Sequence, residues 1–349
     1  MTATVGAAAA RRPPFLRADV LQLHDALQAE QGAGCLAVVT HAEGSTYSKP
    51  GALMLFAADG RQAGLLSGGC LEGDLAERAG RVMASGQVDS VCYDARDVEQ
   101  DVLFGLAFGC EGLLRIHLLP VGGGRGFEPL ASLAEAAACG RRSVWGLVVA
   151  GEAEGKVLPE AVVAPHAVRA TWTLPGGHAA LIEAAAATES WLLMRFAPPP
   201  HLLVLGAGAE APAVAAGAMA LGWQVTVIDH RAAWADARRF GATVRREILD
   251  PRDAGSLALP AADAAVVMAH HLEVDAAWLA RLAGTAIPWV GLLGPAARRG
   301  RLLAGLGAIA PGLAGRVQGP VGLPVGARTP EEIALSILAA AQQAVAAQD

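Results

Sequence analysis

The chain has 349 residues, five cysteines and a formal net charge of −6, and 53% of its residues are hydrophobic. This length exceeds what one ordinary core needs and predicts two domains. The negative net charge argues against nucleic-acid binding, and so does the lack of a run of basic residues with aromatic residues among them. An odd cysteine count without CxxC spacing argues against a disulfide scaffold or a zinc knuckle, and it indicates reduced thiols in a cytoplasmic protein.

Two segments bear on export and membrane insertion. No apolar signal core follows the arginine pair at positions 11 and 12, so we expect no export signal there. Residues 1–14 are expected to be a disordered leader. Residues 211–228 carry no formal charge over a length that could cross a bilayer. Pro212 and the preceding strand-and-turn pattern instead predict a buried helix followed by a strand, so we expect no membrane segment.

Residues 15–197 are predicted to form an α+β domain. Val20, Leu23 and Leu27 recur at helical spacing and begin it with a helix. Further along, periodicity and turn residues predict strands over 35–40, 52–56, 62–66, 88–93, 113–119, 142–150 and 191–196, and a helix over 71–85.

Two cysteines of this domain stand in glycine-rich frames, Ser67-Gly68-Gly69-Cys70 and Gly109-Cys110-Glu111-Gly112. Glycine removes bulk and permits positive φ, so a thiolate and nearby backbone N–H groups can reach a ligand together. Cys70, at the start of a predicted helix, is the leading functional cysteine. For Cys110, packing in a tight turn is the alternative.

Other polar residues of this domain have ordinary explanations as well. Glu72 is either a base near Cys70 or a first-turn carboxylate that suits the helix dipole. Cys35, Cys92 and Cys139 lie in strand and helix patterns and are expected to be core residues.

Residues 198–349 are predicted to form a second domain after a polyproline spacer at Pro198-Pro199-Pro200. Strands and helices alternate there, with strands over 201–205, 224–228, 264–268 and 289–293 and helices over 210–221 and 233–240. This alternation predicts an α/β domain with a Rossmann-like, doubly wound parallel sheet.

The first turn of the second domain reads G-x-G-x-x-A, from Gly206 through Gly208 to Ala211, between a strand and a helix. Gly206 allows the tight turn, and Gly208 lets a phosphate approach the backbone. Asp229 ends the next strand, where NAD(P) sites hold ribose, whereas nearby Arg231 suits a phosphate.

His270 follows a later strand, at the carboxyl end where such sheets bind ligands. Glu210 adds negative charge to the phosphate turn and weakens an NAD assignment. The alternatives are a site for a nucleotide or another phosphorylated ligand, and a purely structural Rossmann domain.

These motifs together resemble the XdhC/CoxI family, the maturation factors of xanthine dehydrogenase and related molybdenum hydroxylases. The resemblance runs through nearly the whole chain and is carried by residues 44–52, 67–72, 104–112, 206–208, 229–231, 291–294 and 321–334.

The resemblance implies a chaperone that binds molybdenum cofactor, as molybdopterin or its cytosine dinucleotide. Such a protein protects the cofactor during sulfuration and passes it to a xanthine dehydrogenase-type hydroxylase. A cysteine desulfurase is the implied sulfur donor, and a homodimer the implied assembly. Cys70, also a candidate molybdenum ligand, Cys110 and Glu72 are then the reactive residues. The expected cofactor-binding residues are Ser45, Gly68, Gly69, Gly206, Gly208, Asp229, Arg231, His270 and Gly294.

An NAD(P)-dependent oxidoreductase is the alternative that the glycine turn and Asp229 suggest. No hydride-transfer Tyr-Lys pair supports it, because the only tyrosines are Tyr47 and Tyr93. A ligand-free interaction scaffold is a third hypothesis.

Overall fold

The computed structural model describes residues 16–96, 112–150, 155, 157–159, 168–173, 179–184, 190–241, 243–253 and 258–348. The chain divides into two compact units between Pro198 and Pro199, inside the proline run. The expected leader, residues 1–14, lies outside the described residues.

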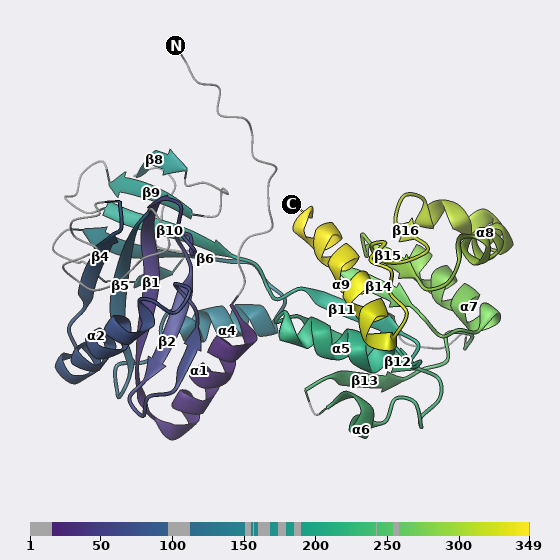
Figure 1. Cartoon of the computed structure of the whole chain (residues 1–349), viewed down its shortest axis with the longest axis horizontal. Coiled ribbons are helices and arrows are strands. Elements are labelled where there is room, and N and C mark those ends of the chain that lie inside the picture. The colour runs from purple at the N-terminus through teal and green to yellow at the C-terminus, as the bar shows by residue number, and fades with distance from the viewer. Residues whose placement is uncertain are drawn as a thin grey trace, which may run out of the picture. The chain divides into compact units, whose positions relative to one another are not determined.

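The first unit contains a five-stranded antiparallel sheet with the strand order β3-β2-β1-β5-β4 (Figure 1). Its strands are β1 (Ala33–Gly44), β2 (Leu53–Ala57), β3 (Gln62–Gly64), β4 (Asp89–Asp94) and β5 (Gly112–Gly122). Both faces are covered, because Leu36 and Val38 pack with α1 (Ala18–Glu30) while Ala37 and Val39 pack with α2 (Glu72–Ser85). This explains why β1 reads as one continuous apolar run.

A second antiparallel sheet of the same unit has the order β7-β6-β10-β9-β8. It consists of β6 (Ser143–Ala150), β7 (Val157–Pro159), β8 (Val168–Thr173), β9 (Ala179–Ala184) and β10 (Ser190–Phe196). Trp145 and Phe196 stack at 5.9 Å and join the core that α1 and α4 (Leu130–Ala138) share. The sequence predicted β6 and β10, whereas β7, β8 and β9 have no counterpart among the expected strands.

The second unit is a six-stranded parallel sheet with the order β13-β12-β11-β14-β15-β16. Its strands are β11 (His201–Leu205), β12 (Gln224–Asp229), β13 (Arg245–Ile248), β14 (Ala264–Val267), β15 (Val290–Leu292) and β16 (Val317–Gln318). Counted from β11, this is the Rossmann order 3-2-1-4-5-6, with its switch point between β11 and β14. The predicted fold class is therefore confirmed.

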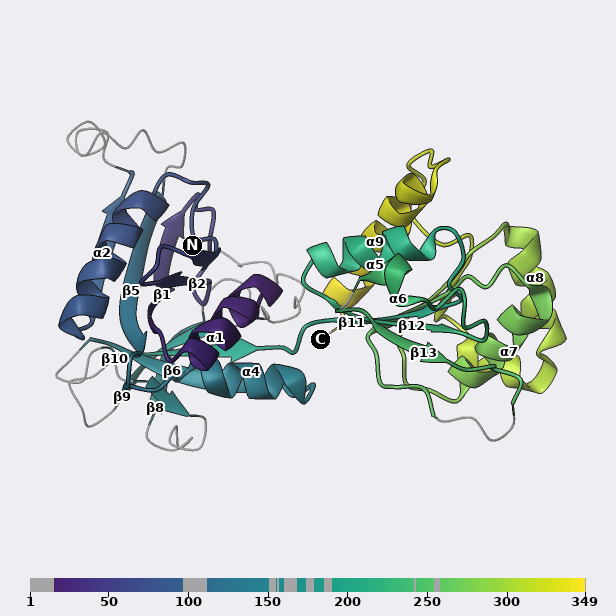
Figure 2. The same ribbon diagram turned by 90° about the horizontal axis from the view of Figure 1, so that it is seen from below.

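Helices cover both faces of this parallel sheet (Figure 2). On one face, α5 (Ala211–Ala220) and α9 (Pro330–Ala346) pack so closely that a Cβ on Gly217 would lie 2.4 Å from Leu338 Cδ1. On the other face, α7 (Leu272–Ala283), α8 (Ala296–Gly305) and the 3₁₀ segment Gly307–Leu313 share a core with the strands.

Residues 211–228 form α5 and β12, and among the described residues no helix combines the length and apolarity that crossing a membrane requires. The helix predicted over 233–240 is shorter, because α6 (Ala237–Phe240) starts only where the Asp236 carboxylate accepts a hydrogen bond from Arg238 N at 2.8 Å.

Candidate functional site

Cys70 stands in an exposed glycine loop that leads from β3 into α2. Gly68, Gly69 and Cys70 are all exposed. Gly69 has φ +109°, a conformation that favours glycine, and no heavy atom of the described residues lies within 4 Å of a Cβ placed on Gly68 or Gly69. Because α2 begins at Glu72, the thiol precedes the helix by two residues. The loop therefore presents both its backbone and its thiol to solvent.

The side chains of Ser67 and Glu72 fix the conformation of this loop. The Glu72 carboxylate accepts hydrogen bonds from Ser67 N at 2.8 Å, from Leu71 N at 3.2 Å and from the Ser67 hydroxyl. Ser67 Oγ in turn accepts from Gly69 N at 3.2 Å and Leu71 N at 3.0 Å. Burial opposes ionisation of Glu72, but the hydrogen bonds from Ser67 outweigh it and hold the pKa of Glu72 below its ordinary value. An ionised carboxylate engaged in this way is suited to positioning the loop.

Two backbone donors of the loop remain available to a ligand. Within the described ranges, the N–H groups of Gly68 and Cys70 donate to no protein acceptor. Together with the thiol, they form a donor set that can contact a ligand carrying both polar and soft atoms.

A cavity of about 40 Å³ adjoins the Cys70 loop. Its lining comes from the segment after β1, from the loop itself and from β4 and β5, and comprises Thr46, Tyr47, Ser67, Gly68, Cys70, Leu71, Tyr93, Ala95, Gly112 and Leu114. Of the described residues, Thr46 and Tyr47 rather than the predicted Ser45 line it. A volume of this size holds a few water molecules or one end of a ligand.

Gly112, in the cavity wall, packs closely against the segment that follows β1. A Cβ on Gly112 would lie 2.5 Å from Thr46 Cγ2 and 2.7 Å from Ser45 O. Only glycine permits so close an approach, which explains the glycine that ends the second cysteine frame. Cys110 itself, two positions earlier in the sequence, lies outside the described residues.

Tyr93 contributes a phenol to the cavity wall. Its hydroxyl donates to Asp74 Oδ2 at 2.5 Å, and Arg78 Nε pairs with the same carboxylate oxygen at 2.8 Å. Burial and the Asp74 carboxylate raise the pKa of Tyr93 above its ordinary value, so the phenol stays protonated. No role for Tyr93 at this cavity was predicted from the sequence, although alternation along β4 places it on the inward face with Val91.

The remaining described cysteines fall into two groups. Cys35 is fully buried, and burial raises its pKa to about 12. The expectation of a core position is wrong for Cys92 and Cys139, which are exposed. Cys92 faces outward because β4 is an edge strand with alternating exposure, and Cys139 lies beyond the end of α4.

The predicted residues of the second unit gather at the carboxyl edge of the parallel sheet. Gly206 has φ +106°, and a Cβ there would lie 2.4 Å from Ala269 N, so only glycine lets β11 end beside the segment that follows β14. A Cβ on Gly208 would lie 3.0 Å from His270 Cδ2. The switch point of the sheet is thus closely packed around the glycine turn.

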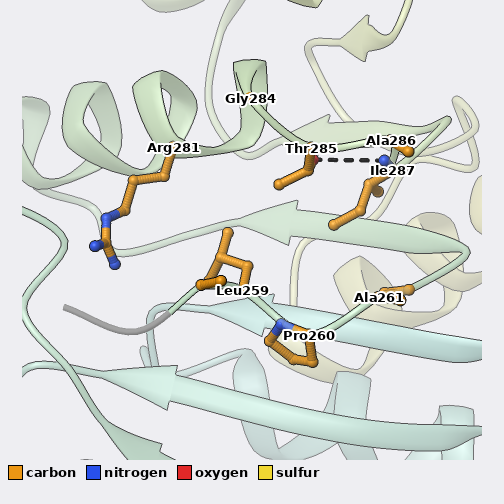
Figure 3. A pocket seen from close by; sticks show the side chains of 10 residues that line it. Leu259, Pro260, Ala261, Arg281, Gly284, Thr285, Ala286 and Ile287 are labelled. Carbon is orange, nitrogen blue, oxygen red and sulfur yellow. Dashed lines mark hydrogen bonds between the residues drawn. The ribbon is translucent and has the colours of Figure 1, made fainter.

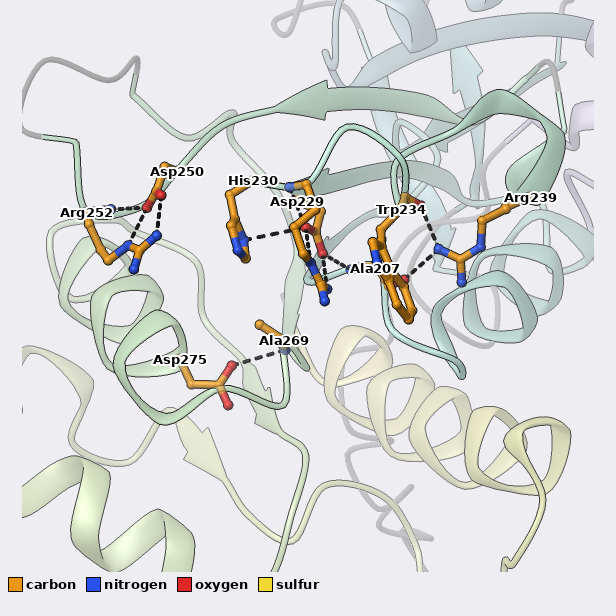
Figure 4. Close-up of polar contacts among 10 residues, drawn as sticks. Ala207, Asp229, His230, Trp234, Arg239, Asp250, Arg252, Ala269 and Asp275 are labelled. Carbon is orange, nitrogen blue, oxygen red and sulfur yellow. Dashed lines mark hydrogen bonds and ion pairs between the residues drawn. The ribbon is translucent and has the colours of Figure 1, made fainter.

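Asp229 is buried beneath this turn and belongs to a polar network (Figure 4). Its carboxylate accepts hydrogen bonds from Ala207 N at 2.7 Å and from Arg231 Nη2 at 2.8 Å. Burial opposes ionisation, but the hydrogen bonds from Arg231 and Ala207 keep the pKa of Asp229 below its ordinary value. Asp229 and Arg231, predicted as alternative ligand contacts, are therefore bonded to each other.

Arg239 and Trp234 also hold the turn, and neither was predicted from the sequence. The Arg239 guanidinium donates to Ala207 O at 2.7 Å and to Gly208 O at 3.0 Å. It lies 4.9 Å from the Trp234 ring, which Arg231 also contacts at 4.4 Å. The only sequence signal for these contacts was the presence of a tryptophan and an arginine shortly after the strand that ends at Asp229.

The His270 side chain reaches the glycine turn and pairs with the Glu210 carboxylate. Its Nε2 lies 2.9 Å from Glu210 Oε2, and its backbone adopts φ +60°, which is uncommon outside glycine. The Glu210 carboxylate therefore points to the imidazole. This arrangement explains how a carboxylate is accommodated beside a phosphate-type turn.

Gly294 belongs to a separate contact at the same sheet edge. A Cβ there would lie 2.8 Å from Arg298 Cδ, and Arg298 pairs with the buried Asp275 at 2.6 Å. Asp275 also accepts a hydrogen bond from Ala269 N at 3.1 Å. Burial raises the pKa of Asp275 despite the guanidinium beside it.

A larger cavity, of about 460 Å³, has none of these residues in its lining, most of which Figure 3 labels. Leu259 and Pro260, before β14, and Thr285 and Ile287, before β15, are among its lining residues. It therefore lies at the amino ends of the strands, opposite the edge where doubly wound sheets bind ligands.

No group of three or more His, Cys, Asp or Glu side chains is placed to hold a metal ion in the part of the chain that the structure describes.

Two family models match the chain. The model described as "XdhC and CoxI family" matches residues 27–94, which include the Cys70 loop. The model described as "XdhC Rossmann domain" matches residues 202–340, which include the glycine turn.

A relative and a solved structure extend the similarity. The chain is 31% identical over 323 residues to a Bacillus subtilis (strain 168) protein named as a probable xanthine dehydrogenase subunit, covering 90% of this chain and 94% of the relative. It also resembles a crystal structure described as a xanthine dehydrogenase from Bacillus halodurans, with a TM-score of 0.72, 24% identity, and coverage of 94% and 96% of the two chains. The second likeness concerns the fold alone.

Proposed function

Because this chain belongs to the XdhC and CoxI family, we propose that it binds molybdenum cofactor, protects it during sulfuration and delivers it to a xanthine dehydrogenase-type hydroxylase. One observation carries the proposal: the exposed Cys70 thiol lies at a cavity, beside two N–H groups that donate to no acceptor among the described residues. A cysteine desulfurase would supply the sulfur. A cytoplasmic location suits the role, because Cys70 must stay reduced.

The chemistry of the Cys70 loop fits the metal-bearing end of this cofactor. The cofactor supplies a molybdenum atom on a dithiolene, so a single soft protein ligand is sufficient. Cys70 would occupy that position and shield the metal from water, and the N–H groups of Gly68 and Cys70 would bind polar ligand atoms. Ser67 and Glu72 hold the loop in the required conformation. Protonated Tyr93 contributes its phenol to the wall.

The glycine turn of the second unit, taken by itself, is suited to a phosphate group such as the one that molybdenum cofactor carries. Within the described ranges, the N–H groups of Gly208, Ala209 and Glu210 donate to no protein acceptor, and they precede the amino end of α5. Backbone N–H groups at such a position attract an anion. The glycine turn is therefore suited to holding a phosphate group.

Anaerobic copurification tests this function. The protein, expressed with its natural client system and purified under reducing conditions, is assayed for molybdenum and pterin. We expect both in the wild-type protein and at least a several-fold loss in Cys70→Ala and in Cys110→Ala. Cys92→Ala is the matched control, because it removes an exposed thiol outside the cavity lining.

Two results would overturn the proposal. One is a wild-type protein that carries no pterin under these conditions. The other is a Cys70→Ala variant that retains as much molybdenum and pterin as Cys92→Ala, since the thiol would then have no part in holding the cofactor.

A further inference from the structure

The acceptor positions of the Asp229 carboxylate are filled by the protein itself. A carboxylate offers about four lone-pair positions. Oδ1 accepts from Arg231 N at 2.8 Å and Arg231 Nε at 2.9 Å, while Oδ2 accepts from Ala207 N at 2.7 Å and Arg231 Nη2 at 2.8 Å. The His230 ring adds a contact at 3.5 Å, and the Asp229 side chain is 0% exposed.

This saturation removes the group that a dinucleotide needs. In NAD sites of this fold, an acidic residue at the end of the second strand accepts hydrogen bonds from ribose hydroxyls. Here the corresponding carboxylate has neither a vacant acceptor position nor an exposed surface. A ribose could gain its hydrogen bonds only by displacing Arg231, whose two-pronged contact with a carboxylate is among the stronger ion pairs.

The segment after β12 reinforces this arrangement. Trp234 lies against both Arg231 and Arg239, and Arg239 donates to Ala207 O and Gly208 O. Figure 4 shows Asp229, Trp234 and Arg239 grouped around Ala207. Both polar backbone groups of Ala207 are consequently engaged within the chain, whereas the N–H groups of Gly208 to Glu210 stay available to a phosphate.

We infer that Arg231 is a specificity-determining residue, which closes Asp229 to ribose and makes the glycine turn a site for a phosphomonoester instead of a dinucleotide. NADH is rejected on this basis, and so is the cytosine dinucleotide form of the pterin. The choice between pterin forms rests on the proposed function, whereas the rejection of NADH does not.

An NADH titration of the full chain, followed by nucleotide fluorescence, tests the role of Arg231. Wild-type protein is expected to show no saturable binding. Arg231→Ala removes both guanidinium contacts to Asp229 and keeps the backbone one. It should show saturable NADH binding, because regaining one hydrogen bond to a charged group tightens binding by at least about tenfold. Arg231→Lys is a second variant, because it keeps a charge beside Asp229 but loses the planar fork.

The Arg238 and Asp236 pair provides a matched control. It repeats the same two-residue spacing and donor pattern, with Arg238 Nη2 2.8 Å from Asp236 Oδ2, but it lies on the surface. Arg238→Ala should leave NADH binding absent. Circular dichroism of each variant checks that the fold is retained.

Each outcome of these titrations either supports or overturns the inference. Binding gained in either Arg231 variant supports the inference. Saturable NADH binding by the wild type that Asp229→Asn weakens overturns it, and so do two folded Arg231 variants without any gain. For the pterin form, release of a cytosine nucleotide from copurified cofactor would contradict the phosphomonoester assignment, while absence of all pterin would count against the proposed function and leave the NADH result standing.

Discussion

Ser67 and Glu72 form one hydrogen-bonded unit beneath the loop that carries Cys70. The Glu72 carboxylate accepts from Ser67 N at 2.8 Å and from the Ser67 hydroxyl, and the same hydroxyl oxygen accepts from Gly69 N and Leu71 N. The conformation of the loop therefore depends on the charge of a single carboxylate.

Glu72→Gln should lower the free energy of unfolding at neutral pH by about 1 to 2 kcal/mol, because hydrogen bonds to an ionised acceptor are lost. The folded pKa of Glu72 lies below its unfolded value. Its stabilisation is thus fully present above pH of about 4.3 and is lost as the pH falls through the folded pKa. Urea unfolding of the wild type and of Glu72→Gln at several pH values should show that their difference in unfolding free energy becomes smaller in acid.

Glu77→Gln is the control for this experiment, since Glu77 is exposed on the same helix. Its effect should stay within about 0.5 kcal/mol. If Glu72→Gln lowered the free energy of unfolding by the same amount at every pH, the side-chain packing of Glu72 and not its charge would hold the loop.

Gly206→Ala should destabilise the second unit by about 3 kcal/mol or more, because the new Cβ meets the Ala269 backbone at 2.4 Å and φ is +106°. Gly307→Ala isolates the backbone contribution, since Gly307 has φ +51° and no atom in the part of the chain that the structure describes lies within 4 Å of the added Cβ. It should cost about 1 to 2 kcal/mol. If chemical denaturation showed that Gly206→Ala and Gly307→Ala lower the free energy of unfolding equally, the close packing assigned to Gly206 would be contradicted.

Thiol alkylation of the native protein should label Cys70, Cys92 and Cys139 readily, because all three are exposed. Cys35 should react only after unfolding, since it is buried and its pKa is raised to about 12. Peptide mass spectrometry after a timed iodoacetamide pulse reads each site. Labelling of Cys35 at the rate of Cys92 would contradict its core position.

Asp275→Leu should cost about 3 to 5 kcal/mol of unfolding free energy, because it leaves the partly buried Arg298 guanidinium unpaired. The double variant Asp275→Leu with Arg298→Met should recover most of that loss, since apolar groups can replace a buried ion pair. Thermal and urea unfolding of the three proteins measure the coupling. A double variant as unstable as the single one would place the cost in the Ala269 N–H instead.

The sequence by itself determined the fold class and the positions of the two glycine segments. Alternating strands and helices after the proline run required a parallel doubly wound sheet, and Gly206 and Gly208 lie where that sheet turns into α5. Local chemistry sufficed here, because glycine spacing and hydrophobic periodicity report backbone conformation directly.

Tertiary structure alone decided what the polar residues do. Arg231 is two positions from Asp229, yet the sequence could not show that its guanidinium saturates that carboxylate, nor that Arg239 returns to the carbonyl oxygens of the turn. Cys92 looked like a core residue until β4 proved to be an edge strand. Side-chain partners depend on contacts between distant segments, which periodicity along the chain does not encode.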